Sequence, residues 1–487
     1  MPRDKDRADF DAGRKEPARS FLGLREDPLL KAVHKAIGGI PAWLVGGAVR
    51  NLVLSVPSAP DYDFAIEGDV KGAAERVAER LKGSCFILDE ETSTWRVAVK
   101  AGLTLDFALV KGDILRDLSL RDFTVNAMAL DLRKLIEDDA PTIIDPTGGL
   151  ADAGLRLLRM ASPDVFDNDP LRVLRAFRLS LQYGLEIEGR TRLSLTQKAP
   201  LLENVSVERI RDELILIFSS RGAARTVRAL YDSGVIAHVW PEFKGWSDIG
   251  GYDLLAHALK ALEEAESLVN NITDETFPGV AKELKAHLGR KAWHIERKAV
   301  LKLAAFLHDA GKELVISREE GRLRFIGHDF EGAKVVSEAL KRLKFSNRLA
   351  GTVAGLVKNH HRVFGIAQLA ERTFRAKAHL FRASGGPDGV DLVCLALSDA
   401  RATRGGEDTE LYRIALELLE FYFRVYLKKR PKPLLNGREV MRIFKVREGP
   451  EVGEILTFIN EGVEKGLVRD KTEAIEYAKA RLIHKSK

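Results

Sequence analysis

The first 150 residues alternate between strand-like and helix-like patterns of hydrophobic positions. An apolar stretch over residues 43–49 contains Gly46 and Gly47 and predicts a strand that turns directly into a helix. Strand-like apolar clusters follow at residues 64–66, 95–99 and 103–110. After the first of these clusters, residues 70–81 have the period of an amphipathic helix. The pattern therefore predicts a small α/β unit that ends near residue 150.

From Pro170 onward the pattern is helical, with short joints expected at residues 247–251 and 431–433. The predicted fold is an α/β head followed by an all-α neck, body, further helical domain and tail. The first twenty residues mix acids and bases with almost no apolar content, which is typical of disorder. The expected boundaries are a disordered tail over 1–25, the head over 26–155, the neck and body over 156–250, a helical domain over 251–430 and a helical tail over 431–487.

Composition and charge narrow the class of protein. A chain of 487 residues suggests two to four domains, and 45% hydrophobic with 30% charged residues is ordinary for a soluble protein. The formal net charge of +6 fits a polyanionic partner without establishing one. Cys85 and Cys394 stand alone in apolar surroundings, which excludes a disulfide framework and fits a reducing cytoplasm. Apolar runs such as residues 214–218 are too short to span a bilayer.

A first group of acidic residues predicts metal-dependent chemistry in the head. Asp61 and Asp63 are two residues apart, and on a strand this spacing points both side chains to one face. Carboxylate oxygens on one face suit hard divalent ions such as Mg²⁺. Gly46 and Gly47 let backbone N–H groups approach a triphosphate closely, and Asp106 adds a third acid on a neighbouring predicted strand. Each motif alone is more often structural, but together they predict phosphoryl transfer.

Six motifs follow one another between residues 43 and 214. They are Gly46–Arg50, the pair Asp61 and Asp63, Arg121–Ala127, Asp145–Gly149, Asp169–Arg175 and Ser206–Ile210. In this order the motifs resemble the class II tRNA nucleotidyltransferase and bacterial poly(A) polymerase family. The resemblance implies a nucleotidyltransferase head that uses Mg²⁺, with tRNA and CTP as partners.

The resemblance also implies a role for each matching residue. Asp61 and Asp63 would bind the metals, and Asp106 would be the third catalytic acid. Gly148 and Gly149 correspond to the hinge between head and neck. The residues implied to bind the nucleotide are Gly46, Gly47, Arg50, Arg121, Asp122, Asn126, Asp169, Arg172 and Arg175.

Asp169 and Arg172 match the pair that reads the Watson–Crick edge of CTP or ATP in this family. A carboxylate accepts from an exocyclic amine, and a guanidinium donates to a ring nitrogen or oxygen. Alternatively, Asp169 before Pro170 is the N-cap of a helix whose first residue is proline. The ordered motifs around the pair favour base reading.

The sequence departs from the family pattern at three positions and in one length. Asn51 replaces an aspartate, Leu120 replaces an arginine, and Asn168 replaces a glutamate that anchors the base-reading arginine. Only residues 112–120 lie between the last predicted strand and the arginine motif, where full CCA-adding relatives carry a longer basic loop. A shortened loop resembles the CC-adding enzymes, whose pocket does not switch from CTP to ATP. A merely divergent loop is the alternative.

A second set of metal-binding side chains lies in the helical half of the chain. Its members are His257, His308, Asp309, His328, His360, His361 and Asp399. Imidazoles and carboxylates on several helices suit one or two divalent ions. Their order resembles the HD phosphohydrolase superfamily. The core ligands in that resemblance are His257, His308, Asp309 and Asp399. His328, with either His360 or His361, would complete a two-metal variant that hydrolyses phosphoesters with Mg²⁺, Mn²⁺, Ni²⁺ or Co²⁺. A scaffold that has lost catalysis is the alternative.

The leading hypothesis is transfer of CMP from CTP to the 3′ end of tRNA, stopping after two cytidines. Full CCA addition with CTP and ATP, poly(A) synthesis, and a hydrolytic HD enzyme with a vestigial head are the alternatives. The segment 433–479 resembles the family's tRNA-binding tail. Lys428, Lys429, Arg430 and Lys432 offer phosphate contacts there, or form only a solvated charge run. Neither a membrane nor an obligate protein partner is expected.

Overall fold

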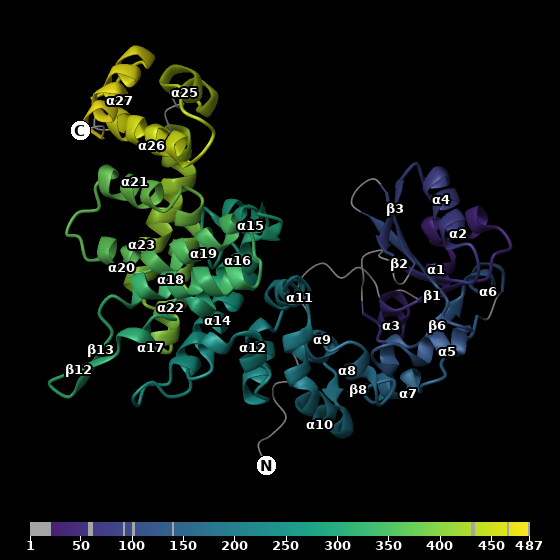
Figure 1. Ribbon diagram of the computed structural model, residues 1–487. Helices are drawn as coiled ribbons and strands as arrows, with labels where there is room; N and C mark the ends of the chain where they lie inside the picture. The colour runs from purple at the N-terminus through teal and green to yellow at the C-terminus, as the bar shows by residue number, and fades with distance from the viewer. Residues whose placement is uncertain are drawn as a thin grey trace.

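The computed structural model describes residues 21–56, 62–90, 93–99, 103–138, 141–429, 434–464 and 467–485. Most of the predicted N-terminal tail, Asp61 and the expected joint at 431–433 lie outside these ranges. Figure 1 shows a sheet-containing head at one side and a larger helical part at the other, joined by helices α9 (Arg172–Tyr183), α11 (Val207–Ser219) and α12 (Ala223–Asp232). Among the described residues, no helix combines the length and apolar composition that a bilayer span requires.

The head is built on one mixed sheet in the order β3-β4-β5-β2-β1-β6-β7. Its strands are β1 (Ala42–Val45), β2 (Tyr62–Ile66), β3 (Ser84–Asp89), β4 (Thr94–Ala98), β5 (Thr104–Leu109), β6 (Ala129–Asp131) and β7 (Ile143–Ile144). β2 and β5 are parallel, and the other neighbours are antiparallel. The strands predicted near residues 43, 64, 95 and 103 are therefore confirmed, whereas β3, β6 and β7 were not predicted.

Helices α2 (Pro28–Ile37) and α4 (Val70–Leu81) cover one face of this sheet, and α5 (Ile114–Ser119) packs against part of the other face through Leu118. The other head helices are α1 (Phe21–Arg25), α3 (Gly47–Val53), α6 (Leu132–Glu137), α7 (Gly149–Gly154) and the 3₁₀ turn η2 (Thr124–Asn126). α4 has the predicted bounds because Asp69 caps its first turn by accepting from the Gly72 N–H at 2.8 Å. Its apolar side packs with α2 and with Phe64 and Phe107 of the sheet in one hydrophobic cluster. Burying these aromatic rings removes apolar surface from water and fixes the strand register.

The chain then becomes helical, as predicted. The connecting elements are β8 (Leu157–Leu158), α8 (Val165–Asn168), α9 (Arg172–Tyr183), β9 (Glu186–Ile187), α10 (Gly189–Lys198), η3 (Ala199–Asn204), α11 (Val207–Ser219), α12 (Ala223–Asp232), α13 (Ile236–Val239) and η4 (Pro241–Phe243). α9 buries Val173, Leu174 and Phe177 at helical spacing, while Arg172 and Arg175 remain only partly buried. This spacing lets one helix join the core and still present guanidinium groups to the head.

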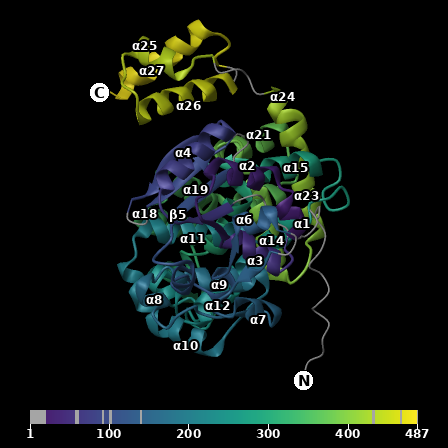
Figure 2. The same cartoon turned by 90° about the vertical axis from the view of Figure 1, so that its right-hand side faces the viewer.

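The remaining helices form the larger part of the molecule and a separate terminal group. The larger part contains α14 (Leu254–Asn270), α15 (Ala281–Leu288), β10 (Lys291–Ala292), β11 (Ile295–Glu296), α16 (Arg297–Leu307), α17 (Lys312–Val315), β12 (Ser317–Glu319), β13 (Arg322–Arg324), α18 (His328–Arg342), α19 (Asn347–Asn359), α20 (Arg362–Ala367), α21 (Phe374–Ala383), α22 (Asp388–Arg404), α23 (Thr409–Glu420), the π-helix η5 (Phe421–Tyr426) and α24 (Leu427–Lys429). The last three helices are α25 (Gly437–Phe444), α26 (Pro450–Glu464) and α27 (Lys471–Lys485), which Figure 2 shows grouped at one end. The two-stranded ribbons β8–β9, β10–β11 and β12–β13 were not expected in the all-α part.

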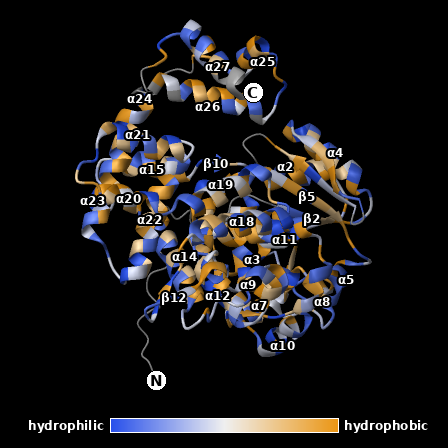
Figure 3. Cartoon of the chain, turned by 60° about the vertical axis from the view of Figure 1, so that its left-hand side comes forward, coloured by the Kyte–Doolittle hydropathy of each residue, from blue (hydrophilic) through white to orange (hydrophobic). Residues whose placement is uncertain are grey.

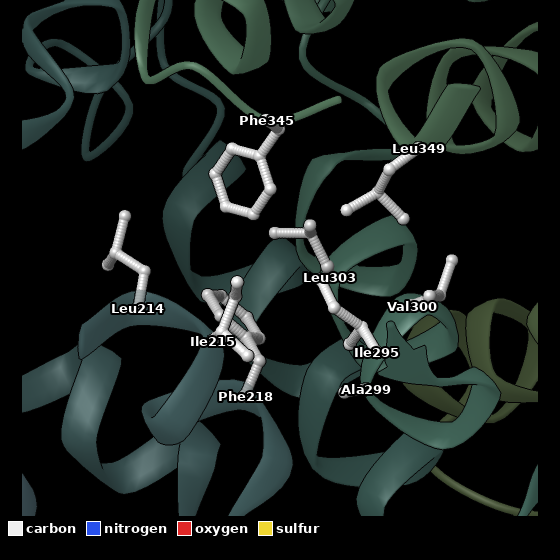
Figure 4. Close-up of a pocket in the computed structure, with 9 residues that line it drawn as sticks. All are labelled: Leu214, Ile215, Phe218, Ile295, Ala299, Val300, Leu303, Phe345 and Leu349. Atoms are coloured by element: carbon white, nitrogen blue, oxygen red, sulfur yellow. The ribbon is translucent and has the colours of Figure 1, made fainter. Parts of the chain in front are cut away.

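One hydrophobic core runs through the connecting helices and the larger helical part. Phe218 of α11 and Phe243 of η4 each pack against Phe306 of α16, with ring centroids 6.3 and 6.4 Å apart. Beside them, α11, α16 and α19 line a small apolar pocket of about 10 Å³, which is roughly large enough for one water molecule (Figure 4). In Figure 3 the helices are banded with hydrophobic and hydrophilic residues, as expected of amphipathic helices packed into one core.

Candidate active site and candidate metal centre

The turn from β1 into α3 brings the backbone close to the predicted catalytic acids. Gly46 has a φ of 67°, which favours glycine, and a Cβ at this position would lie 2.8 Å from Asp63 Oδ2. The same Cβ would lie 3.8 Å from Arg121 Nη1. The glycine pair therefore adjoins both an acid and an arginine of the predicted site, and a larger residue at Gly46 would displace the Asp63 carboxylate.

Asp63 and Asp106 lie side by side on the sheet. They are register partners on the parallel strands β2 and β5, so their side chains share one face. Asp106 accepts two hydrogen bonds from Arg96 of β4, from Nε and from Nη2, both at 2.7 Å. Arg96 was not among the predicted residues. Its only sequence signal is a charged residue between Trp95 and Val97 in a strand.

A buried hydrogen-bond network connects four of the predicted nucleotide-binding residues. Arg50 donates from Nη1 to Asn126 Oδ1 at 2.7 Å, and Asn126 donates to Asp122 Oδ1 at 2.9 Å. Arg175 donates to Asp122 Oδ2 at 3.2 Å. Burial alone would raise the pKa of Asp122, but Arg175 and the hydrogen bond from Asn126 outweigh it and lower that pKa. Arg50 also donates to the Tyr183 hydroxyl at 2.5 Å, which ties α3 to α9. The network thus fixes the head against the neck.

The predicted base-reading pair lies at the start of α9. Arg172 Nε is 3.9 Å from Asp169 Oδ2, and Arg209 donates to the same oxygen at 2.9 Å. Arg172 also donates to the carbonyl oxygens of Leu120 at 3.4 Å and Val165 at 3.3 Å. α9 begins at Arg172, and its N-cap residue is Leu171. The Asp169 side chain accepts from the Leu171 N–H at 3.3 Å, so Asp169 also caps the turn that leads into α9, and the capping alternative stays open beside base reading.

One glycine of the predicted hinge, Gly149, packs closely against the arginine motif, whereas a Cβ on Gly148 would meet nothing within 4 Å. A Cβ on Gly149 would lie 2.2 Å from the Thr124 carbonyl oxygen, so only glycine allows this approach. Asp145 accepts from the N–H groups of Gly149 and Leu150 at 2.7 and 2.9 Å. The start of α7 is thereby held against η2.

The short connection before the arginine motif contains a helix, and the residues on both sides of this helix are bound to one of its side chains. Residues 114–119 form α5, which Asp113 caps by accepting from the Arg116 N–H at 2.9 Å. At the other end, Asp117 is ion-paired with Arg121 at 3.1 Å and accepts from the Lys111 N–H at 3.3 Å. Both ends of the connection are therefore held together by one aspartate, and little chain remains that could move as a loop.

The structure also brings the seven predicted metal ligands of the helical half together. In the first cluster, His257 Nε2 is 3.2 Å from His308 Nε2 and 3.1 Å from Asp309 Oδ2. Asp399 Oδ1 lies 3.3 Å from His257 Nε2. A second cluster contains His328, whose Nε2 is 3.4 and 3.2 Å from the Nε2 atoms of His360 and His361. Asp309 lies between the clusters because its Oδ1 is 3.2 Å from His328 Nε2.

The orientation of the imidazole rings fits metal binding. The Nδ1 atoms of His308, His328 and His360 face the carbonyl oxygens of Ala305, Phe325 and Val357 at 2.9, 2.6 and 2.6 Å. A carbonyl can only accept, so each Nδ1 carries a proton, and Nε2 is the ring nitrogen that faces the cluster and would bind a metal. The three Nδ1 atoms thus bond to carbonyl oxygens away from the cluster, while the Nε2 and carboxylate atoms converge inside it. Such converging nitrogen and oxygen atoms are the ligands that divalent transition metals prefer.

Electrostatics in this centre are dominated by the buried carboxylates. Burial lowers the pKa of His308, but the charges of Asp309 and Asp399 outweigh it and hold that pKa well above its ordinary value. Burial lowers the pKa of His360 to about 3, with the charge of His308 as a further cause. Lys312, which was not predicted, places its ammonium 2.6 Å from Asp309 Oδ2. A cavity of about 560 Å³ opens beside the clusters, with Tyr252, Lys260 and Lys312 in its wall.

Comparison with known families places these sites in a class. The family described as "Poly A polymerase head domain" matches residues 42–159. "Probable RNA and SrmB- binding site of polymerase A" matches residues 184–246, and "HD domain" matches residues 279–404. The chain therefore combines a nucleotidyltransferase head with an RNA-binding segment and an HD domain.

Relatives over nearly the whole length identify the family. An A-adding tRNA nucleotidyltransferase of Deinococcus radiodurans is 33% identical over 89% of this chain and 94% of its own. A CC-adding enzyme of Geobacter sulfurreducens is 32% identical over 94% and 96%. The chain belongs to the tRNA nucleotidyltransferase family and is an enzyme, as predicted. The Thermotoga maritima CCA-adding enzyme complexed with tRNA shares the fold, with a TM-score of 0.53 at 22% identity over 95% of this chain and 98% of that chain.

Proposed function

We propose that the enzyme extends tRNA lacking CCA by two cytidylates from CTP and then stops. The observation that carries this proposal is the closed connection formed by α5. A pocket that reads two cytidines must change shape before it accepts adenine. In the full CCA-adding enzymes, movement of a long loop would allow that change. Here Asp117 closes the connection at both ends. The carbonyl of Leu120 also holds Arg172, so the helix and the base-reading group support each other in one arrangement.

In this proposal each part of the head has a separate task. Asp61, Asp63 and Asp106 would hold Mg²⁺, which when bound assists attack by the tRNA 3′-OH and stabilises the departing pyrophosphate. The network from Arg50 to Asp122 orients the ribose and triphosphate, together with the adjacent Arg121. The Arg172 guanidinium donates to the cytosine ring acceptors, and the Asp169 carboxylate accepts from its exocyclic amine. Arg209 keeps Asp169 in place.

Three tRNA substrates test this proposal directly. They lack CCA, CA or only the terminal A, and each is incubated with CTP alone, ATP alone or both. We expect the first to gain two cytidylates, the second to gain one, and the third to remain unchanged even with ATP. ATP incorporation onto tRNA ending in CC would contradict the proposal. It would indicate full CCA addition if CTP is also used, and A addition, as in the Deinococcus relative, if CTP is not.

Replacing Arg172 with alanine should weaken selection of the base. Loss of a base-edge donor costs discrimination of about 1–3 kcal/mol by analogy with bidentate base contacts, so we expect the preference for CTP over UTP to fall roughly tenfold or more. The ratio of kcat/KM values for the two nucleotides is the measurement. Arg178→Ala on the same helix, where Arg178 pairs with Glu213, controls for a general loosening of α9 and should leave the ratio unchanged. Unchanged selectivity in Arg172→Ala would remove Arg172 from base reading.

We further propose that the HD domain is a two-metal phosphohydrolase. Two ligand clusters share Asp309, and the cavity beside them is lined by Lys260 and Lys312, whose ammonium groups suit a phosphate. Mg²⁺, Mn²⁺, Ni²⁺ or Co²⁺ would supply the activated nucleophile when bound. A folded enzyme that binds no divalent ion at this centre would instead favour a tRNA-binding scaffold.

A further inference from the structure

The sheet face that carries the catalytic carboxylates continues to the edge of the sheet. Asp63 on β2 is the register partner of Asp106 on β5, and Arg96 on β4 is the next partner in the same row. Phe86 on the edge strand β3 is the register partner of Arg96. Residues directly opposite each other on paired strands share a face. The row Phe86, Arg96, Asp106 and Asp63 therefore runs across four neighbouring strands on one side of the sheet.

The two faces of β3 have different surroundings. The face of the sheet opposite the carboxylates packs on α2 and α4, through Val97 of β4 and Phe107 of β5. Cys85 of β3 belongs to the same hydrophobic cluster. On the carboxylate face, Phe86 is 45% exposed and is the last residue of β3 on that face before the register shift between Ile87 and Asp89. An exposed aromatic residue at a sheet edge is an association hazard that proteins usually avoid, so its position beside the active site calls for a ligand.

The direction of the reaction places the RNA on this side. In phosphoryl transfer the attacking and leaving oxygens are roughly in line, so the two groups approach the α-phosphate from opposite sides. The predicted triphosphate-binding residues Gly46 and Arg50 follow β1, and Arg121 lies just before β6. In the strand order these residues are on one side of Asp63, whereas β4 and β3 are on the other. The nucleophilic 3′-OH must therefore arrive from the β4–β3 side.

We propose that Phe86 and Arg96 form the subsite for the 3′-terminal nucleotide of the RNA substrate, with the base stacked on Phe86. This inference rests on the proposed function of the head. Adjacent strands are about 4.8 Å apart, so Phe86 lies about 10 Å from Asp106 across the sheet. Arg96 lies between them and brings positive charge to the path of the RNA backbone. Aromatic residues on an open sheet face are a known way to stack single-stranded bases.

Fluorescence of a labelled RNA tests the stacking without any nucleotide present. The probe is a tRNA acceptor minihelix that lacks CCA and carries 2-aminopurine at its 3′ end. The full-length enzyme should quench this fluorophore on binding. Phe86→Ala should lose the quenching, and its KM for the RNA should rise about tenfold or more while the KM for CTP is unchanged. The matched control is Ile87→Ala, because Ile87 is the adjacent residue of β3, is 40% exposed and points to the opposite face.

Each outcome decides the proposal. Quenching that persists in Phe86→Ala, or that is lost equally in Ile87→Ala, overturns it. Phe86→Leu keeps an apolar side chain but removes the aromatic ring, so it separates stacking from a general hydrophobic contact. Quenching at the wild-type level in that variant would also overturn stacking. Thermal unfolding should be nearly unchanged in all three variants, because the replaced side chains are exposed. The number of cytidylates added is a separate readout, so a failure of the CC-adding proposal would leave this result intact.

Discussion

Replacing Asp63 with alanine is expected to reduce nucleotide addition on the order of a thousandfold or more while tRNA affinity and folding change little. Asp63 is half-buried and lies beside Asp106, where it would act as a metal ligand. Loss of a ligand removes electrostatic stabilisation of the transition state, which is usually the largest catalytic contribution. Asp61→Ala should have the same effect. Single-turnover incorporation of labelled CTP into tRNA lacking CCA measures the loss, and filter binding measures RNA affinity.

A capping aspartate in the same domain provides the control. Asp69 accepts from the Gly72 N–H at the start of α4, on the covered face of the sheet. Asp69→Ala should lower stability by about 1 kcal/mol, as loss of an N-cap does, and leave incorporation near the wild-type rate. Near-normal incorporation by Asp63→Ala would contradict the catalytic assignment.

The second large effect is expected in the HD domain. His308→Ala combined with Asp309→Ala should reduce bound divalent metal from about two ions per chain to nearly none, because Asp309 lies between both clusters. Any metal-stimulated hydrolysis of phosphomonoesters or 2′,3′-cyclic phosphodiesters should disappear with the metal. Addition of CMP should remain, since the head has its own ligands. Metal analysis after gel filtration and both activity assays provide the measurements.

A milder variant protects this test against misfolding. His308 and Asp309 are buried, and their loss leaves Lys312 without its carboxylate. His361 is exposed and belongs only to the second cluster, so His361→Ala should lower the metal content to about one ion per chain without unfolding the domain. Full metal content in both variants would contradict the site. Metal binding without hydrolysis in the wild type would contradict the hydrolase proposal alone.

The elements that the sequence predicted best are those in which local pattern and tertiary environment agree. α4 matches residues 70–81 because its cap and its apolar period both lie within the segment. β3 was missed because Phe86, Ile87 and Leu88 are consecutive exposed apolar residues on an edge strand, without the alternation that half-buried strands show. The ribbon β8–β9 pairs residues nearly thirty positions apart, and two-residue strands leave no periodicity to detect.

In the candidate sites, too, some residues could be predicted from the sequence and others could not. The proximity of Asp63 to Asp106, and of the histidines to Asp309 and Asp399, could be predicted because the ordered motifs resemble known families. Arg96 and Lys312 could not, because a single arginine in a strand or a lysine after a turn is common. Their significance depends on the partner: Asp106 for Arg96 and Asp309 for Lys312. Only the register of β4 with β5 and the fold of α16 and α17 make those contacts visible.

The continuous core has a consequence for how this enzyme can be divided. Phe306 packs on Phe218 and Trp240 of the RNA-binding half, and it stands two residues before His308. A cut near residue 250 would expose this aromatic cluster on both fragments, so neither half would be expected to fold alone. Unfolding should therefore be a single cooperative event across both halves. The RNA-binding helices and the HD-domain cluster would therefore be kept or lost together in evolution. This would hold even where only one of their activities is under selection.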